Sequence, residues 1–490
     1  NAGNSIESGG NYNVAVGDEA GTAITTGDYN VAVGYIAGDA INTGERNVVA
    51  GHSAGGALTS GGSNTAIGDR TLLADTQGSD SVAIGRNALF AQNFTSATSS
   101  YNIAIGRDAG ASISTGIQNT LIGGLAGDST TTGNDNTGVG YQALGANTTG
   151  HSNAAVGSAS LDANTTGNEN TAVGFGALSA NTTAGENTAI GQNALVTNTT
   201  GAANTALGKS SLYSNTTASN NTAVGKSALG ANTTGASNTA VGKAALTLNT
   251  TGPYNTAVGA DSLDANTTGS ANTAVGFKAL GANTTAANNT AVGADSLDAN
   301  TTGANNTALG AASLTANTTA SNNTAVGHSA LAANTTATSN TAFGKSALAA
   351  NTTGTQNTAV GDVALDANTT GDNNTAVGQQ ALGSNTTADN NTAVGHDALA
   401  ANTEGFNNTA VGSFAMDALT TGDYNTGVGV FALTGETTGA GSTALGYAAL
   451  YAQNSTGSAD MFNTAVGNSA GVAVTDGFHN TFVGAKAGAA

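Results

Sequence analysis

With 490 residues, a formal net charge of −20 and only 4% aromatic residues, the chain is long, acidic and poor in the side chains that fill a large core. The acidic balance argues against nucleic-acid binding, which needs basic side chains to displace counterions. The lack of cysteine excludes disulfides and thiolate metal sites, and the sequence has no run of about 18 apolar residues that would span a membrane.

A repeated phrase organises the chain after an N-terminal lead-in over residues 1–12. Numbering the repeat from the first Asn of NTAVG as position 1, copies begin at Asn13, Asn30, Asn47, Asn64 and Ser81, then at the same even step from Asn102 and Asn119 to Ser442, and finally at Asn463 and Asn480, which gives 28 copies. Such a fixed short period predicts one continuous solenoid over residues 13–490 rather than several globular domains.

Two steps of the repeat are longer than the others. The copies at Ser81 and Ser442 are followed by the next copies only at Asn102 and Asn463, and the extra residues come after the similar phrases ALFAQN and ALYAQN. We therefore predict two matched loop insertions, over residues 93–101 and 454–462, on the same edge of the solenoid.

The phrase NTAVG predicts a short strand that ends at glycine, since a repeat of about 17 residues is too short for a two-helix unit, which needs roughly 33 residues or more. Position 4 is Val, Ile, Leu or Phe in every copy except Ala50, and it shares one face of the strand with position 2. This alternation predicts that positions 2 and 4 form the core, and that positions 3 and 5 form a smooth outer surface of small residues. The core residues expected on this basis, together with position 9, are Val224, Leu229, Val241 and Leu246, and the outer surface includes Ala223, Gly225, Ala240 and Gly242.

Positions 9 and 12 vary together. Copies with Leu at position 9 have a polar residue at position 12, usually Asn, whereas copies with Gly at position 9 mostly have an apolar residue there, as in Gly38 with Ile41. Because a packed core tolerates a moved side chain better than a deleted one, we infer that both positions reach one pocket. Stacked Asn side chains at position 12 predict a hydrogen-bonded ladder along the coils, formed by Asn232, Asn249, Asn266, Asn283 and Asn300.

These features predict an all-β protein, a parallel β-solenoid (β-roll) with one coil per repeat, each coil adding about 4.8 Å. Nine of the ten Lys and Arg residues lie at positions 6 or 7, which therefore face water. The outer ladder of alanine and glycine predicts lateral self-association into a homotrimer or filament, because another backbone can approach small side chains closely.

Several phrases of the repeat resemble those of a known group of proteins. SVAIG at Ser81–Gly85, NIAIG at Asn102–Gly106 and NVAVG at Asn13–Gly17 are similar to the repeated phrase of YadA-like heads, the β-rolls of trimeric autotransporter adhesins. The extended phrase NTAVGxxALxANTTG resembles repeat shafts of phage tail fibres and other bacterial surface fibres. This resemblance implies a left-handed coil, although the repeat of the heads is shorter than that of this chain.

We expect no catalytic residues, no cofactor and no metal site, and therefore no enzyme. His52, His328 and His396 all lie at position 6 but several coils apart, so they are not placed as ligands or as a catalytic pair. Asp261 and Asp264 could attract a cation loosely, as could Asp295 and Asp298, but their spacing lacks the pattern of calcium-binding β-rolls. The Asn-x-Thr triplets are formal glycosylation sites, but an inward position 12 makes them structural and unglycosylated.

The favoured function is an extracellular structural fibre or adhesin, a stalk or head on a cell surface or a virion tail fibre, that mediates attachment or matrix formation. The chain opens with Asn1 rather than Met, which leaves room for a signal or anchor outside it. A host surface or carbohydrate is a candidate ligand, with exposed aromatic contacts at position 17 from Tyr12, Tyr29, Tyr254 and Tyr424. The alternative is an ice-binding β-solenoid that uses the threonine rows at positions 13 and 14.

Overall fold

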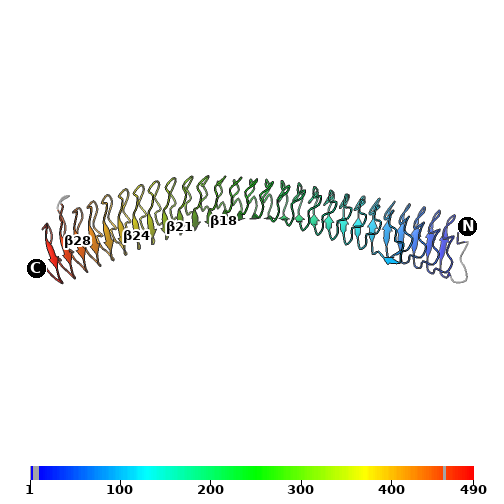
Figure 1. The fold of residues 1–490 in the computed structure, drawn as a ribbon, viewed down its shortest axis with the longest axis horizontal. Coiled ribbons are helices and arrows are strands. Elements are labelled where there is room, and N and C mark those ends of the chain that lie inside the picture. The colour runs from blue at the N-terminus through cyan, green and yellow to red at the C-terminus, as the bar shows by residue number, and fades with distance from the viewer. Residues whose placement is uncertain (1, 4–9, 456–459, 490) are drawn as a thin grey trace. The chain divides into compact units, whose positions relative to one another are not determined.

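The computed structural model describes residues 2–3, 10–455 and 460–489, and it confirms an all-β parallel β-solenoid of about 27 turns, each of about 17 residues. The described residues contain no helix. The chain divides into two compact units, Asn1–Ala244 and Ala245–Ala490. Within each unit, successive strands lie side by side, and a turn leads from each strand to the start of the next (Figure 1).

The strands are short and nearly identical in length. Those of the first unit are β1 (Val14–Val16), β2 (Val31–Val33), β3 (Val48–Ala50), β4 (Thr65–Ile67), β5 (Gly78–Ser79), β6 (Val82–Ile84), β7 (Thr98–Ser99), β8 (Ile103–Ile105), β9 (Thr120–Ile122), β10 (Thr137–Val139), β11 (Ala154–Val156), β12 (Thr171–Val173), β13 (Thr188–Ile190), β14 (Thr205–Leu207), β15 (Thr222–Val224) and β16 (Thr239–Val241). Those of the second unit are β17 (Thr256–Val258), β18 (Thr273–Val275), β19 (Thr290–Val292), β20 (Thr307–Leu309), β21 (Thr324–Val326), β22 (Thr341–Phe343), β23 (Thr358–Val360), β24 (Thr375–Val377), β25 (Thr392–Val394), β26 (Thr409–Val411), β27 (Thr426–Val428), β28 (Thr443–Leu445), β29 (Thr464–Val466) and β30 (Thr481–Val483).

Strands pair in parallel, and each residue meets the same repeat position in the next coil. Val224 of β15 pairs with Val241 of β16, for example. The register survives the two longer steps, since Ile84 of β6 pairs with Ile105 of β8, and β28 pairs with β29 in the same way. Every repeat position within a unit therefore forms a row along the stacked coils, with neighbours about 4.8 Å apart.

The face of each strand that points into the core is the opposite of the predicted one. Ala223 and Ala240 at position 3 are fully buried, whereas Val224 and Val241 at position 4 are only half-buried and face outward. The prediction of Val224 and Val241 as core residues, with Ala223 and Ala240 on the outer surface, was therefore wrong. Leu229 at position 9 is fully buried, as predicted.

Space in a narrow coil explains this reversal. A Cβ atom added at Gly138, which occupies position 3, would lie 3.4 Å from Cδ1 of Leu144 at position 9. The turn thus brings the position-9 leucine directly against the inner face of the strand, where only a methyl group fits. The leucine reaches this place because its backbone is left-handed, with φ of 50° at Leu229 and 54° at Leu246. Leu246 is fully buried as predicted.

The inferred exchange between positions 9 and 12 is confirmed by geometry. A Cβ atom at Gly21 would lie 3.0 Å from Cδ1 of Ile24, and one at Gly55 would lie 3.0 Å from Cδ1 of Leu58. The apolar side chain at position 12 therefore fills the volume that Leu occupies in the other coils.

This shared pocket predicts strong coupling between Leu314 and Asn317. Leu314→Gly removes a buried leucine, and we expect it to lower the free energy of unfolding by about 4 kcal/mol. Asn317→Ile alone overfills the pocket and breaks the amide contacts to Asn300 and Asn334. The double variant restores the Gly/Ile arrangement of the end coils, so its loss should be smaller than the sum of the two single losses by about 1–2 kcal/mol. Denaturant unfolding of the four proteins measures this coupling.

The control pairs Leu314→Gly with Asn351→Ile, which lies two coils further along. Residues this far apart do not share a pocket, so their losses should add within about 0.5 kcal/mol. Equal coupling in both pairs would contradict a shared pocket.

The first predicted insertion forms a short additional parallel pair, in which Ser79 of β5 pairs with Ser99 of β7. In the second, residues 456–459 lie outside the described residues, and the corresponding contact is a parallel bridge between Ala440 and Asp460. The predicted boundaries of the lead-in (1–12), the solenoid (13–490) and the insertions (93–101 and 454–462) stay predictions, and residues 1, 4–9 and 490 also lie outside the described part.

Candidate functional surfaces and polar networks

The predicted asparagine ladder at position 12 is present in both units. Asn266 Nδ2 donates to Oδ1 of Asn249 at 2.8 Å and to the carbonyl of Gly269 at 3.0 Å. The ladder runs on in the same way through Asn283 and Asn300, and Asn232 makes the equivalent bond to Asn215 in the first unit. Because these side chains are buried and both amide hydrogens of Asn266 are engaged, the Asn-x-Thr triplet has a structural role.

A second ladder, not predicted from the sequence, runs through the asparagines at position 1. The backbone amide of Asn272 donates to Oδ1 of Asn255 at 3.0 Å, and Asn272 Nδ2 donates to the carbonyl of Ala286 at 2.8 Å. Asn283 of the first ladder donates to the same carbonyl at 3.1 Å. Both ladders therefore converge on position 15, and together they satisfy the polar groups of a core too thin to be filled by apolar side chains.

The two insertions are joined to the ladders by matching buried networks, which we call the junctions. In the first junction, Gln92 Nε2 donates to Asp75 Oδ2 at 2.7 Å and to Ser81 Oγ at 2.8 Å, while Asn102 Nδ2 donates to Gln92 Oε1 at 2.9 Å. Asp75 and Gln92 are fully buried at position 12. The carboxylate of Asp75 also accepts from the backbone amides of Gly78 and Phe94.

The second junction has the same connections. Gln453 Nε2 donates to Glu436 Oε2 at 2.9 Å and to Ser442 Oγ at 3.0 Å, and Asn463 Nδ2 donates to Gln453 Oε1 at 2.9 Å. Burial raises the pKa of Glu436, but hydrogen bonds from Gln453, Gly439 and Ser455 outweigh burial and leave this pKa below its ordinary value. The sequence signal was present, since an acid stands at position 12 in only these two copies and each precedes an insertion.

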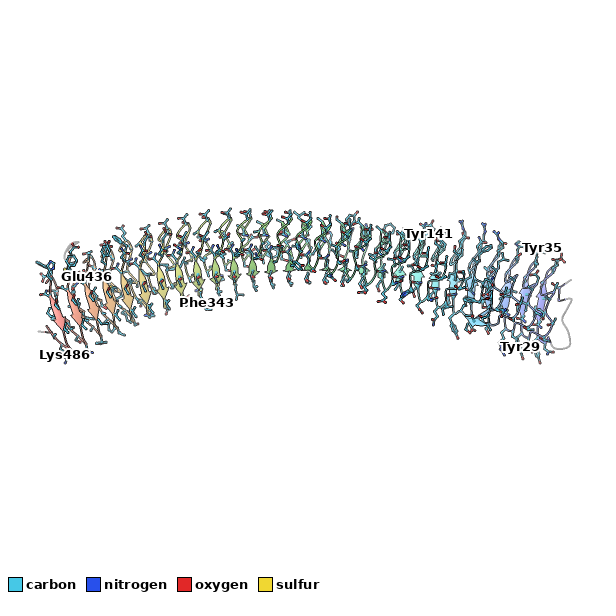
Figure 2. The ribbon with its side chains drawn as sticks, viewed as in Figure 1. Tyr29, Tyr35, Tyr141, Phe343, Glu436 and Lys486 are labelled. Carbon is cyan, nitrogen blue, oxygen red and sulfur yellow. The ribbon has the colours of Figure 1, made fainter. Side chains whose placement is uncertain are left out.

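The outer face of the strands carries a row of position-2 residues, mostly Thr, beside an apolar row at position 4. We call this surface the strand face. Side chains at position 4 are exposed by 36% at Val258, 46% at Leu309 and 56% at Phe343, and Phe343 lies on the strand side of the second unit (Figure 2). The predicted interface is corrected accordingly: Ala223 and Ala240 are fully buried and unavailable to a partner.

The glycines of the predicted interface, Gly225 and Gly242, are half-buried where the strand turns. A Cβ atom at Gly225 would overlap the backbone carbonyl of Gly242. The close backbone approach that these glycines permit is therefore made by the next coil of the same chain. Interaction of Gly225 and Gly242 with another chain stays a prediction.

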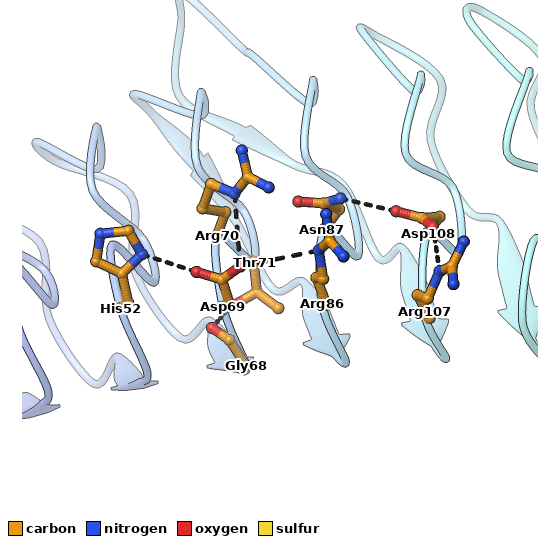
Figure 3. A network of polar contacts seen from close by, with 9 residues as sticks. All are labelled: His52, Gly68, Asp69, Arg70, Thr71, Arg86, Asn87, Arg107 and Asp108. Atoms are coloured by element: carbon orange, nitrogen blue, oxygen red, sulfur yellow. Dashed lines mark hydrogen bonds and ion pairs between the residues drawn. The ribbon is translucent and has the colours of Figure 1, made fainter.

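A surface cluster of charges lies at positions 6 and 7 of the first unit (Figure 3). His52 Nδ1 lies 2.7 Å from Asp69 Oδ1, and Arg70 and Arg86 lie within 4.0 Å of the same carboxylate. The hydrogen bond with His52, followed by the charges of the two arginines, holds the pKa of Asp69 below its ordinary value. The neighbouring Thr71 is fully buried and donates to the Gly68 carbonyl, so the histidine does not activate it.

Seven aspartates share position 10: Asp39, Asp128, Asp162, Asp264, Asp298, Asp366 and Asp417. Burial raises the pKa of each. Oδ1 atoms of Asp264 and Asp298 lie 3.7 Å and 2.6 Å from the place of a Cβ atom at Gly281, so glycine leaves room for them. Among the described residues, no group of three or more His, Cys, Asp or Glu side chains could hold a metal ion.

The tyrosines at position 17 are exposed, from 51% at Tyr29 to 76% at Tyr12. Tyr12 and Tyr29 stack with ring centroids 5.0 Å apart, and Tyr424 packs edge-on against Phe406. These tyrosines are exposed enough to contact a ligand. The longest row of aromatic rings among the described residues lies elsewhere, at positions 6, 7 and 10 of the second unit.

No model of a known protein family matches this chain, and no curated protein matches it. The parallel β-solenoid that the resemblance to YadA-like heads implied is present. Within the described ranges, no helix is long and apolar enough to cross a membrane.

Proposed function

We propose that the protein is a structural fibre subunit outside the cell, an adhesin stalk or head on a cell surface or a virion tail fibre, and that it associates laterally with further copies of itself through the strand face. The observation that carries this proposal is the exposed apolar row at position 4. Continuous apolar rows of this kind are uncommon on the surface of monomeric proteins and mark interaction sites.

A second copy of the chain is the occupant that fits this surface best. The rows repeat about every 4.8 Å, and a partner with the same period can meet each coil with an equivalent one. Positions 2 and 4 carry no charged residue in any copy, although the chain has a net charge of −20. The charges lie on the turns, so two copies can bring their strand faces together without direct repulsion.

The resemblance to trimeric adhesin heads and fibre shafts supports this proposal through the repeated phrase alone. Three-fold assembly and a left-handed coil belong to the same proposal. A host surface or glycan remains the proposed target of attachment.

The double variant Leu309→Glu/Phe343→Glu is expected to weaken or abolish self-association, because it places two charges on each strand face that would have to be buried in the assembly. The molar mass from light scattering over a range of concentrations measures the effect. The wild-type chain should have the molar mass of a trimer or larger assembly, and the variant should shift toward the monomer.

The control is Leu248→Glu, since Leu248 is 52% exposed but lies on a turn. It should leave the assembly unchanged. A monomeric wild-type chain, or equal dissociation of both variants, would count against association through the strand face.

Ice binding is the second candidate, because the strand face presents outward threonines at position 2 in a regular row. The threonines at position 13 are less suitable, because the hydroxyl of Thr250 donates to the carbonyl of Thr267 at 3.0 Å, and this pattern repeats along the coils. An ice binder needs its face free, so a monomer that shows thermal hysteresis and shapes ice crystals favours this candidate. An assembled chain without hysteresis removes it.

A further inference from the structure

A row of aromatic rings follows the turns of the second unit over successive coils. His396 packs edge-on against Phe414 with centroids 5.2 Å apart, and Phe414 stacks on Phe431 at 5.4 Å. Phe431 in turn makes T-shaped pairs with Tyr447 and Tyr451, with ring centroids 6.2 Å and 6.3 Å apart. The row lies on the turns, so it is separate from the strand face and does not depend on the association proposed above.

A surface depression of about 350 Å³ lies beside Phe414. It is lined by Ala400, Ala401 and Phe414 together with the polar residues Gln380, Ser384, Asp397 and Asp417. One oxygen of Asp397 faces His396 at 3.0 Å. The depression therefore places an aromatic ring beside two carboxylates.

The charge around the depression is one-sided. The sequence from Ser346 to Ala485 contains 11 Asp and Glu residues and neither Lys nor Arg. Burial raises the pKa of Asp417 and repulsion from Asp397 adds to this effect, while hydrogen bonds from Thr434 and from the backbone amides of Asp417 and Ala418 oppose it. A bound cation would relieve both, because it neutralises the repulsion and replaces lost hydration.

We propose that this depression binds the ammonium group of a small organic cation, with the ring of Phe414 against its alkyl surface and Asp397 and Asp417 facing its charge. Aromatic faces attract alkylammonium ions through the negative potential of the ring, and adjacent carboxylates add direct charge attraction. A quaternary ammonium head and the end of a lysine side chain both have this chemistry.

The test uses the full chain and two probes, choline and its uncharged isostere in which carbon replaces the quaternary nitrogen. Titration calorimetry and saturation-transfer NMR should show choline binding with a dissociation constant of about 1 mM, a value typical of so few contact atoms. The uncharged isostere should bind at least about tenfold more weakly. Equal binding of both probes, or no binding of choline, overturns the proposal, and so does preferred binding of a neutral methyl glycoside.

Two variants locate the site. Asp417→Asn and Phe414→Leu should each weaken choline binding about fivefold to tenfold, with circular dichroism confirming the fold. Asp162→Asn is the matched control: Asp162 shares position 10 and burial also raises its pKa, but it lies in the first unit, away from the aromatic row. An equal loss in Asp162→Asn would overturn the assignment. Binding of a short lysine peptide is then compared with binding of its acetylated form. This comparison shows whether the site accepts an ammonium group on a polypeptide as well as one on a free small molecule.

Discussion

Gly310→Ala is expected to lower the free energy of unfolding of the second unit by about 3–5 kcal/mol. Gly310 has a φ of +137°, a backbone angle that residues other than glycine rarely adopt. This strain alone costs the alanine variant about 1–3 kcal/mol. The added Cβ atom would lie 2.5 Å from the carbonyl oxygen of Gly327 in the next coil. The coils must then separate, which weakens the bond from the Gly327 amide to Leu309. Thermal unfolding and hydrogen exchange of the flanking amides measure the loss.

Gly484→Ala provides the matched control. Gly484 occupies the same position and has a φ of +119°, but a Cβ atom there would have nothing within 4 Å. Only the backbone strain remains, so the loss should be about 1–3 kcal/mol and confined to the last coil. Equal losses in the two variants would mean that stacking against the next coil does not explain glycine at position 5.

The fold was predictable because every copy of the repeat has the same local structural preferences and stacks in register on the next copy. A strand phrase that recurs at a constant step has one simple way to pair, with its own copy in the next coil, and the two longer steps keep this register. The exchange between Gly38 and Ile41, and between Leu229 and Asn232, also predicted the pocket correctly. Packing density forces such compensation wherever two side chains share one volume.

The wrong face of the strand was predicted to point inward. A period of two separates the two faces of a strand, but it does not show which of them is buried. Size suggested that Val224 should be inside, but the coil is too narrow for Val and Leu on facing sides. The deciding signal was the variation at position 3. Val49 accompanies Gly55, and a Cβ atom at this glycine would lie 2.8 Å from Val49 Cγ1. Only a residue at an inward position needs such compensation.

Leu121 shows the same dependence more strongly, since a Cβ atom at Gly127 would lie 2.7 Å from its Cδ2. Phe482 near the C-terminus lies similarly close to Gly471, at 3.0 Å. Comparing position 3 with position 9 across the copies would therefore have oriented the strand without a structure. Asn at position 1 carried no such signal, because an Asn before a strand is equally typical of a turn.

Glu436→Ala is expected to lower the free energy of unfolding of the second unit by about 3–5 kcal/mol. Oε1 of this buried carboxylate accepts bonds from the backbone amide of Gly439 at 2.7 Å and from Ser455 Oγ at 2.9 Å. Oε2 accepts from Gln453 at 2.9 Å. Alanine leaves these donors buried without an acceptor, and each costs about 1–3 kcal/mol before relaxation. Denaturant unfolding, followed by the fluorescence of Tyr451 and its neighbours, measures the loss of stability.

Glu436→Gln removes the negative charge of the side chain but keeps its size and shape. One side-chain oxygen can still accept from Gly439 and Ser455, but the new amide nitrogen faces the amide nitrogen of Gln453, so two donors meet. We expect a loss of about 2–3 kcal/mol, smaller than that of the alanine variant. The exposed Glu404→Gln should change stability by less than about 0.5 kcal/mol.

The pH dependence provides an independent measurement of the same charge. Because the pKa of Glu436 is lower in the folded chain than its ordinary value of 4.5, the folded state binds the proton less readily than the unfolded state does. Its stabilising contribution is therefore complete above pH 4.5 and is lost as the pH falls through the folded pKa. The position-10 aspartates act in the opposite direction, since their pKa values are raised. The wild-type chain should therefore lose more stability than Glu436→Gln between pH 6 and pH 3, whereas Glu404→Gln should follow the wild type. A Glu436→Gln chain with the same acid dependence as the wild type would contradict a buried, ionised carboxylate at this junction.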